Sequence, residues 1–348
     1  MVAEANGPGL GVGSLCTIRT ADGDNIDAEV VGVRDNRVVI MPLGELRGVK
    51  PGSRVMYKTS RASVPVGQAF LGRVIDGSGN PLDGKGAIVP DADYPVYGRQ
   101  LNPMERGVIN EILDVGVRSI NAMTTIGKGQ RMAIMAGSGV GKSMLMSMMT
   151  RNTAADVTII ALIGERGREV REFVERTLGE AGLTKSIVLA ATSDMPALVR
   201  IRGAHTATAL AEYFRDQGKD VLLIMDSITR YAMSLREVGL ASGEPPSAKG
   251  YTPSVFNQLP KIMERAGTVE KSGSITGIYT VLVEGDDMNE PIADAVRSIA
   301  DGHIVLSRAL SHKGHYPSVD VLASISRVMD DIAGDSHCDA AREVVRVL

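Results

Sequence analysis

The stretch from Met132 to Ser143 reads Met-Ala-Ile-Met-Ala-Gly-Ser-Gly-Val-Gly-Lys-Ser, and the organisation of the whole chain follows from it. It opens with an uninterrupted run of apolar residues and alanines, which is typical of a strand buried on both faces of a sheet. A glycine-rich turn comes next, followed by a helix-like run from Met144 to Met149. Strand, glycine-rich turn, Lys-Ser and helix, in this order, are the parts of a phosphate-binding P-loop.

The residue types of this loop suit a phosphate ligand. Glycines let backbone N–H groups curl around a phosphate, and the N-terminus of the following helix adds a favourable dipole. Lys142 can reach the β- and γ-phosphates of ATP, and the hydroxyl of Ser143 can hold Mg²⁺. The strict motif has glycine in place of Ala136, but a plain turn with a surface lysine is disfavoured because strand and helix flank the loop. The expected nucleotide-binding residues are Gly137, Ser138, Gly139, Val140, Gly141, Lys142, Ser143 and Met144.

Composition places the chain among ordinary globular proteins, with 44% hydrophobic and 23% charged residues. The net charge of −3 does not indicate nucleic acid or an anionic membrane as a partner. Cys16 and Cys338 lie near opposite ends and are not expected to pair, which suits a reducing compartment. Because no apolar run approaches ~18 residues and no signal peptide opens the chain, we expect a cytoplasmic protein.

The first part of the chain reads as short strands broken by turns. The strands are expected at 14–20, 26–33, 37–41 and 54–58. A spacing of about ten residues per strand predicts a small β-barrel. Gly and Pro punctuate the segment from Val66 to Gly84, so we place the domain boundary near its start. Residues 1–66 are then the barrel domain, and residues 67–331 the next domain.

From Gln130 the pattern alternates between strands and helices. Strands are expected at 132–136, 157–164, 186–191, 221–226, 273–283 and 303–307, and helices at 143–152, 166–180, 195–217, 227–238 and 252–266. This alternation predicts an α/β fold, with a parallel sheet covered by helices on both faces and ligands at the carboxyl ends of the strands. The apolar spacing of Ile109 to Met123 predicts a further helix, and residues 330–348 also read as helical.

Two carboxylates follow buried strands of the predicted sheet. Asp226 ends the apolar run that begins at Val221, where an acid can hold Mg²⁺ opposite Ser143. An acid at a strand end also caps helices, so the pairing with Lys142 is what favours the metal role. Glu165 follows the run 157–164 and can orient or deprotonate the attacking water. Its alternative role is to favour the first turn of the next helix.

Arginines and one tyrosine complete the candidate site. Arg166 follows Glu165 directly, and Glu169 can pair with a nearby arginine. Arg230 lies one helical turn beyond Asp226 and can approach the γ-phosphate, with a surface ion pair as the alternative. Tyr316 precedes a proline and is a candidate platform for adenine, with core packing as the alternative. Arg327 can reach a neighbour's γ-phosphate as an arginine finger if subunits form a ring.

Several motifs together resemble one known family, the ATPases of flagellar and virulence type III protein export, which are relatives of the catalytic subunit of rotary ATP synthase. The matching motifs are Gly-Ser-Gly-Val-Gly-Lys-Ser (137–143), Ala-Leu-Ile-Gly-Glu-Arg-Gly-Arg-Glu-Val (161–170), Asp-Ser-Ile-Thr-Arg-Tyr-Ala (226–232), Gly-Leu-Ala-Ser-Gly-Glu-Pro-Pro (239–246), Tyr-Thr-Pro-Ser-Val-Phe (251–256) and Asp-Gly-His-Ile-Val-Leu-Ser-Arg (301–308). The resemblance implies a RecA-like P-loop NTPase core behind a small N-terminal β-barrel. Residues 332–348 are then the start of a truncated C-terminal helical domain.

The resemblance also implies roles for single residues. The phosphate lysine falls on Lys142, the Mg²⁺ ligands on Ser143 and Asp226, and the catalytic carboxylate on Glu165. The remaining matches are Arg166 beside that carboxylate, Arg230 at the γ-phosphate, Tyr316 at the adenine and Arg327 acting in trans. ATP and Mg²⁺ are the implied cofactors.

The partners implied by the resemblance are those of an export machine. They are the other subunits of a homohexamer, the export gate and stalk proteins, a regulator, and complexes of chaperone and cargo, with peripheral association at the inner face of the cell membrane. The implied function is ATP hydrolysis at subunit interfaces that drives chaperone release, unfolding and delivery of export substrates.

Two other functional classes share parts of this pattern. A ring translocase acting on nucleic acid also joins a small barrel to a RecA-like core, but its barrel needs exposed aromatic and basic residues, and residues 1–66 offer only Tyr57 as an aromatic. A non-catalytic nucleotide-binding subunit of a rotary ATPase lacks the catalytic carboxylate, and Glu165 argues against that class.

Overall fold

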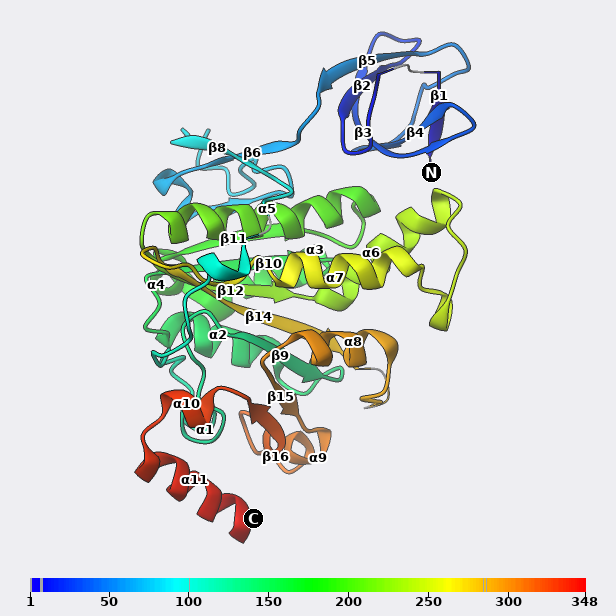
Figure 1. Cartoon of the computed structure of the whole chain (residues 1–348). Helices are drawn as coiled ribbons and strands as arrows, with labels where there is room; N and C mark the ends of the chain where they lie inside the picture. Colours follow the sequence, from blue (N-terminus) through cyan, green and yellow to red (C-terminus); the bar gives the residue numbers. More distant parts are fainter. Residues whose placement is uncertain (1, 7–8, 100, 284, 286) are drawn as a thin grey trace.

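The apolar runs of the sequence form one central sheet, with strands in the order β16-β15-β9-β14-β12-β10-β11-β7 (Figure 1). The computed structural model describes residues 2–6, 9–99, 101–283, 285 and 287–348. Neighbouring strands pair in parallel, except that β16 is antiparallel to β15 and the short β13 is antiparallel to β14. The strands are β7 (Val74–Ile75), β9 (Arg131–Ala136), β10 (Val157–Ile163), β11 (Ser186–Ala191), β12 (Asp220–Asp226), β13 (Gly267–Thr268), β14 (Ser274–Leu282), β15 (Gly302–Leu306) and β16 (Val319–Ser326).

Helices cover both faces of this sheet because its strands are apolar on both sides. In β10, Ile159 and Ala161 belong to one buried cluster, whereas Ile160 and Leu162 belong to another. The first cluster contains α5 (Ala197–Asp216), α6 (Ile228–Ala241), α7 (Pro253–Met263) and α8 (Pro291–Ile299). The second contains α1 (Arg118–Met123), α2 (Lys142–Asn152), α3 (Gly167–Glu172) and the π-helical turn Phe173–Leu178 that joins α3 to α4 (Gly179–Leu183).

Shorter elements lie at the edges of the central domain. They are the hairpin of β6 (Ser63–Val66) and β8 (Ala92–Pro95), the helices α9 (Arg308–His312), α10 (Met329–Ile332) and α11 (Asp335–Val347), and the 3₁₀ turns Gln68–Phe70, Pro103–Glu105 and Ala248–Gly250. Among the described residues, no helix is both long and apolar enough to cross a lipid bilayer.

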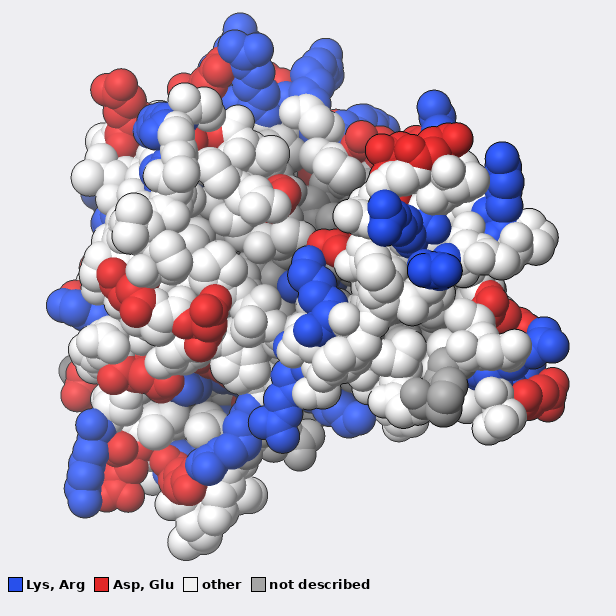
Figure 2. Space-filling view, turned by 90° about the horizontal axis from the view of Figure 1, so that it is seen from above, with Lys and Arg blue, Asp and Glu red and all other residues white. Residues whose placement is uncertain are grey.

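The N-terminal strands form a separate antiparallel sheet around a core of its own. The strands are β1 (Ala3–Ala5), β2 (Leu15–Arg19), β3 (Asn25–Arg34), β4 (Arg37–Pro42) and β5 (Arg54–Thr59), in the order β1-β4-β3-β2-β5. They curl around buried residues such as Cys16, Ile18 and Val30, and the resulting barrel lies at the opposite end of the molecule from α11 (Figure 1). From above, basic and acidic side chains are both scattered over this end of the molecule, with uncharged areas between them (Figure 2).

The predicted strands and helices are present with shifts of a few residues at their ends, but one helix was wrong. The sequence predicts a helix over Ile109–Met123, whereas only Arg118–Met123 is helical. Leu113, Val115 and Val117 are buried and alternate with more exposed residues, which is the period of an extended chain. The segment is held by backbone hydrogen bonds, one of them from the N–H of Leu113 to the carbonyl of Ile126 at 2.8 Å.

Several elements of the central domain were not predicted from the sequence, and β16 and α8 are the longest of them. β16 is an edge strand with the sequence Val-Asp-Val-Leu-Ala-Ser-Ile-Ser, and most of its residues are only partly buried, so it lacks the apolar run of a central strand. α8 begins at Pro291 and buries Ile292, Ala293 and Val296 against the sheet. Both elements depend on tertiary packing more than on local sequence.

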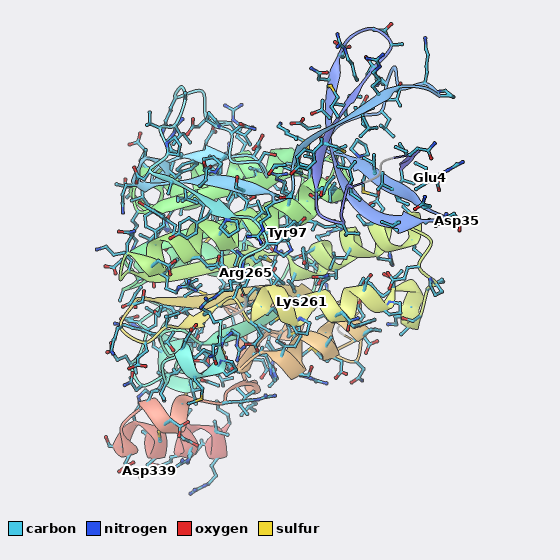
Figure 3. All side chains as sticks on the ribbon, turned by 45° about the horizontal axis from the view of Figure 1, so that its top comes forward. Glu4, Asp35, Tyr97, Lys261, Arg265 and Asp339 are labelled. Carbon is cyan, nitrogen blue, oxygen red and sulfur yellow. The ribbon has the colours of Figure 1, made fainter. Side chains whose placement is uncertain are left out.

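A polar cluster joins the barrel to the central domain, and its members are buried except for Tyr97, which is 40% exposed. The phenol of Tyr97 donates a hydrogen bond to Glu29 of β3 at 2.9 Å, and its ring lies edge-on to His205 of α5. Arg265, labelled with Tyr97 in Figure 3, belongs to the same cluster. It contacts His205 and makes two hydrogen bonds of 2.8 and 2.7 Å to Glu212. Burial raises the pKa of Glu29, while the hydrogen bond from Tyr97 opposes that rise. The charged side chains of Glu212 and Arg265 are therefore buried, and removing the partner of either one would lower the stability of the fold.

We predict that Glu212→Ala lowers the free energy of unfolding of the central domain by about 3–5 kcal/mol, because Arg265 is left buried without its carboxylate. Chemical denaturation followed by circular dichroism measures the change. Glu343→Ala on the exposed face of α11 is the control and is expected to stay within about 0.5 kcal/mol of the wild type. A similar small loss in Glu212→Ala would contradict the prediction.

Candidate functional site

The P-loop connects the end of β9 to the start of α2. Gly139 and Gly141 have φ values of 77° and 90°, in the left-handed region that favours glycine. A Cβ on Gly141 would lie 3.5 Å from two ring carbons of Tyr316, so the ring of Tyr316 packs directly over the loop. Val140 between the two glycines is buried, and its carbonyl accepts a 2.5 Å hydrogen bond from Ser318. The loop is therefore anchored at its middle, and Ser138 and Gly139 are exposed.

Lys142, at the first position of α2, meets two carboxylates that follow neighbouring strands. Its Nζ contacts Oδ1 of Asp226 and lies 3.7 Å from Oε1 of Glu165. β10 and β12 pair in parallel, with Leu162 opposite Asp226, so both carboxylates emerge at the same edge of the sheet. The side chain of Asp226 is 3% exposed, against 13% for Lys142 and 19% for Glu165. The three charged groups predicted separately from the sequence thus share one partly enclosed space.

Thr280 is a site residue that the sequence analysis missed. It lies on β14, between the P-loop strand β9 and β12, and its hydroxyl donates a 2.5 Å hydrogen bond to Oδ1 of Asp226. A threonine in an apolar strand carries no functional signal by itself. Its relevance depends on β14 lying next to β12, which only the topology gives.

Glu165 is poised to accept a proton near neutral pH. Burial is the main cause that raises its pKa, to about 7, and the nearby carboxylate of Asp226 raises it further, while the ammonium of Lys142 opposes the rise. A general base works best when its pKa lies close to the working pH. Its position and its pKa therefore both suit proton transfer at this edge of the sheet.

The residues present also suit a magnesium ion bound together with nucleotide. Ser143 exposes its side chain on the first turn of α2, and Asp226 lies below it at the end of β12. Among the described residues, both hydrogen bonds to Asp226 are made through Oδ1, so Oδ2 remains for a ligand. Magnesium characteristically takes one or two protein oxygens and completes its shell with water and phosphate. No cluster of three or more acidic, His or Cys residues in the described part of the chain offers a metal site independent of nucleotide.

Arg230 lies beside this site, whereas Arg166 faces solvent. The side chain of Arg230 packs against Gly164, because a Cβ added to Gly164 would lie only 2.9 Å from the Cβ of Arg230. Gly164 also has a φ of 73°, in the left-handed region. The Nε of Arg230 is buried without a hydrogen-bond partner in the described part of the chain, so the guanidinium retains donor capacity. Arg166 instead makes a 2.9 Å ion pair with Glu169, the pairing expected from the sequence.

Tyr316 lies at the P-loop, as its predicted role requires, with 60% of its surface exposed. Its hydroxyl is hydrogen-bonded to Ser311 of α9 at 2.9 Å, which fixes the ring while leaving it accessible. Core packing, the alternative considered from the sequence, is excluded by this exposure. The ring can therefore serve as a stacking surface next to the phosphate loop.

Arg327 is the one predicted site residue that the fold keeps away from its own P-loop. It follows β16, whose last residue Ser326 pairs with Gly302 at the beginning of β15. The P-loop lies beyond the other end of these strands, next to Ala136 and Leu306. The intervening strand length corresponds to roughly 17 Å, so Arg327 does not complete the site of its own subunit.

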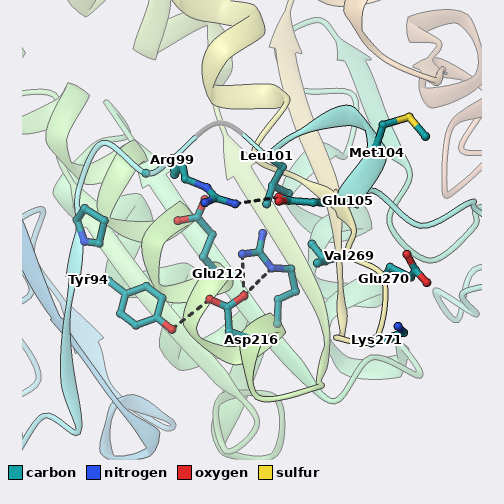
Figure 4. A pocket seen from close by; sticks show the side chains of 13 residues that line it. Tyr94, Arg99, Leu101, Met104, Glu105, Glu212, Asp216, Val269, Glu270 and Lys271 are labelled. Atoms are coloured by element: carbon teal, nitrogen blue, oxygen red, sulfur yellow. Dashed lines mark hydrogen bonds and ion pairs between the residues drawn. The ribbon is translucent and has the colours of Figure 1, made fainter.

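A sizeable pocket of the described structure lies away from the P-loop. It has a volume of about 500 Å³ and lies near the C-terminal end of α5, between Tyr94 and Lys271 (Figure 4). Within it, Asp216 accepts hydrogen bonds from Tyr94 at 3.1 Å and from Arg215 at 2.7 Å. The candidate catalytic groups of the chain therefore gather in the open P-loop region and not in this pocket.

Comparisons with known proteins support the identification of a nucleotide-binding site at the P-loop. Residues 116–326 match the nucleotide-binding domain of the ATP synthase alpha/beta family, and residues 2–57 match its beta-barrel domain. The flagellum-specific ATP synthase of Bacillus subtilis (strain 168) is 54% identical over 352 residues, covering 100% of this chain and 80% of that protein. The assembled ATPase EscN from the type III secretion system of enteropathogenic E. coli has a TM-score of 0.93 at 45% identity, covering 99% of this chain and 83% of EscN. A second structure of EscN, in complex with its central stalk EscO, has a TM-score of 0.91 at 44% identity, with the same coverage of 99% and 83%.

We predict that ionisation of Glu165 destabilises the nucleotide-free protein. Between its ordinary pKa of 4.5 and about 7, the folded state retains a proton that the unfolded state has lost, so the free energy of unfolding falls as the pH rises through this window. Glu165→Gln removes the ionisation. Its stability relative to the wild type should therefore increase by on the order of 2 kcal/mol between pH 5 and pH 8.

Urea denaturation at the two pH values measures this difference. Glu175→Gln is the matched control, because Glu175 is exposed and its pair with Arg171 is a surface ion pair of little energetic weight. A pH-independent difference between Glu165→Gln and the wild type would show that the carboxyl of Glu165 titrates normally.

Proposed function

This chain belongs to the ATP synthase alpha/beta family, and we propose that it is the ATP-hydrolysing subunit of a bacterial type III protein export apparatus, flagellar or virulence-associated. The observation that carries the proposal is the meeting of Lys142, Glu165 and Asp226 directly behind the P-loop. A lysine, a water-activating carboxylate and a metal-binding carboxylate are the groups that phosphoryl transfer to water requires. The relatives named as a flagellum-specific ATP synthase and a type III secretion ATPase support the export role.

In the proposed mechanism, the backbone of residues 137–143 cradles the phosphates of ATP while Tyr316 stacks on the adenine. Ser143 and Asp226 would hold a Mg²⁺ ion, which would supply positive charge against the phosphates. Glu165 holds the attacking water in line with the γ-phosphate and accepts its proton as the new bond to the γ-phosphorus forms, while the bond from that phosphorus to the β–γ bridging oxygen breaks and ADP leaves. Lys142 gives up its contacts with the two carboxylates and pairs with the β- and γ-phosphates, and Arg230 stabilises the charge that develops on the transferred group.

Arg327 completes the site of a neighbouring subunit in this proposal. It is exposed, and in the described structure its guanidinium donates only a 3.4 Å hydrogen bond to the carbonyl of Arg297. No ion pair with a carboxylate of the described chain neutralises it. A homohexamer brings each Arg327 to the P-loop of the next subunit, where an arginine finger is worth ~10³-fold or more in turnover.

We further propose the surroundings in which this ATPase works. The subunit acts in the cytoplasm at the inner face of the cell membrane, with which it associates only peripherally. EscN in complex with its central stalk EscO is the precedent for a stalk protein as partner of the ring. The export gate, a regulator and chaperone–cargo complexes are the remaining proposed partners, and ATP turnover would release chaperones and unfold and deliver the cargo.

We predict that Glu165→Gln retains nucleotide binding but lowers turnover at least about 10²-fold, because the amide cannot accept the proton of the attacking water. Binding of a fluorescent ATP analogue and phosphate release measure the two properties. Lys142→Ala is the companion variant, and it should lose binding itself. Near wild-type turnover by Glu165→Gln would remove Glu165 from the mechanism. Nucleotide binding without turnover by the wild type would indicate a non-catalytic subunit instead, and turnover stimulated by RNA would favour a nucleic-acid translocase.

We predict that the specific ATPase activity of the wild type rises with protein concentration, and that Arg327→Ala lowers the plateau roughly 10³-fold, because the site is completed only on assembly. Steady-state turnover over a concentration series, together with sedimentation, tests this. Arg346→Ala, which changes an exposed arginine of α11, is the control and should match the wild type. A specific activity that is independent of concentration and of Arg327 would contradict the shared site.

A further inference from the structure

The backbone of Arg327 is linked by hydrogen bonds, through Asp301, to the strand that leads into the P-loop. The backbone N–H of Arg327 donates to the carbonyl of Asp301 at 2.9 Å. The carboxylate of Asp301 is held by three hydrogen bonds of 3.0 Å from Arg131, made by its backbone N–H, Nε and Nη2. Arg131 is the first residue of β9, and β9 leads directly into the P-loop. The strand β9 thus begins at Arg131, which holds Asp301 next to Arg327, and ends at the phosphate loop.

A second side chain at the beginning of β9, that of Gln130, makes further hydrogen bonds to the residues around Arg327. Gln130 is fully buried, and its Nε2 donates to the carbonyl of Asp301 and to Oγ of Ser326, both at 3.1 Å. Ser326 immediately precedes Arg327, and its hydroxyl donates in turn to the carbonyl of Thr125 at 2.7 Å. We call Gln130, Arg131 and Asp301 the β9 clamp.

The packing at the clamp leaves little room for adjustment. A Cβ on Gly302, next to Asp301, would lie 2.4 Å from the carbonyl oxygen of Ile325 and 3.0 Å from Cα of Ser326. The backbones of β15 and β16 are therefore in close contact just before Arg327. Arg131 also contacts Glu264, which is held from its other side by Arg106 at 3.1 Å. The charged groups of Arg131 and Asp301 are thus paired with each other and with Glu264, whereas no described carboxylate pairs with Arg327.

We propose that the β9 clamp positions Arg327 for the neighbouring subunit's site and connects that position to this subunit's own P-loop strand. Asp301 and Arg131 are then positioning residues that touch no substrate and act through the finger. This inference rests on the proposed function of Arg327 in trans. It assigns to a set of residues remote from the P-loop an effect on a site in another subunit.

The test begins with Asp301→Asn, which keeps the shape of the side chain but removes the charge that Arg131 holds. Displacing a catalytic group by about 1 Å can lower the reaction rate about 10²-fold. We therefore expect kcat to fall about ten- to a hundredfold, with the KM for ATP within about twofold of the wild type. Arg131→Lys keeps the charge but loses the planar fork, and it should show the same pattern. Asp339→Asn is the control, because Asp339 lies on the distant α11 in an exposed pair with Arg342, and it should keep wild-type turnover (Figure 3).

Mixed assemblies separate an effect on the finger from an effect on the fold. Asp301→Asn subunits are assembled with an excess of Glu165→Gln subunits, whose own sites barely turn over but whose Arg327 is intact. Most Asp301→Asn sites then receive an undisturbed finger from their neighbour. We expect turnover per Asp301→Asn subunit to recover at least about fivefold, as it should for Arg327→Ala subunits in the same mixture.

The outcomes distinguish this inference from the proposed function on which it rests. Recovery of Arg327→Ala without recovery of Asp301→Asn would overturn the clamp as a positioning device and leave the trans finger intact. Recovery of neither would overturn the shared site, and the clamp with it. Wild-type kcat for Asp301→Asn before mixing would also overturn the proposal.

Discussion

The placement of the Lys142 ammonium between the carboxylates of Asp226 and Glu165 is the interaction on which the rest of the structure depends. A P-loop lysine must be free to move onto phosphate, yet a charge at this depth is costly without a partner. The two carboxylates stabilise it until nucleotide arrives. Burial of Glu165 raises its pKa to about 7, so the same arrangement that holds the lysine also prepares the base. Stability of the free protein and readiness for catalysis are therefore opposed at this one place.

The parallel sheet is what makes this arrangement possible. Lys142, Glu165 and Asp226 are far apart along the chain, and they meet because parallel strands deliver their carboxyl ends to one edge. β14 is inserted between the P-loop strand and β12, and it adds Thr280 as a hydrogen-bond donor to Asp226. The apolar strands that predicted the fold and the polar groups that predicted the chemistry are thus consequences of the same topology.

How much the sequence could predict follows from how local each signal is. The P-loop, Glu165 and Asp226 were identifiable because a strand, a turn and a functional side chain are adjacent in the sequence. Thr280 was missed because its role depends on which strand becomes its neighbour. The helix expected over Ile109–Met123 was wrong because Leu113, Val115 and Val117 fit both helical and alternating spacing, and burial selected the alternating one. The pairing of Arg131 with Asp301, 170 positions apart, has no local signal at all.

The location of Arg327 suits the proposed shared site. Arg230 lies beside its own P-loop and is available to that site without assembly, whereas Arg327 lies at the opposite end of β15 from the P-loop. At the amino ends of β9 and β15 it is separated from its own P-loop by a strand length of roughly 17 Å, and no described carboxylate forms an ion pair with it. β9 spans that distance as a hydrogen-bonded strand in the middle of the sheet, with Arg131 at one end and the phosphate loop after the other. A displacement of the loop on nucleotide binding can therefore reach the finger through a stiff, buried element, and not through a flexible surface segment. In the proposed ring, this geometry would make the nucleotide occupancy of each subunit a determinant of its neighbour's chemistry.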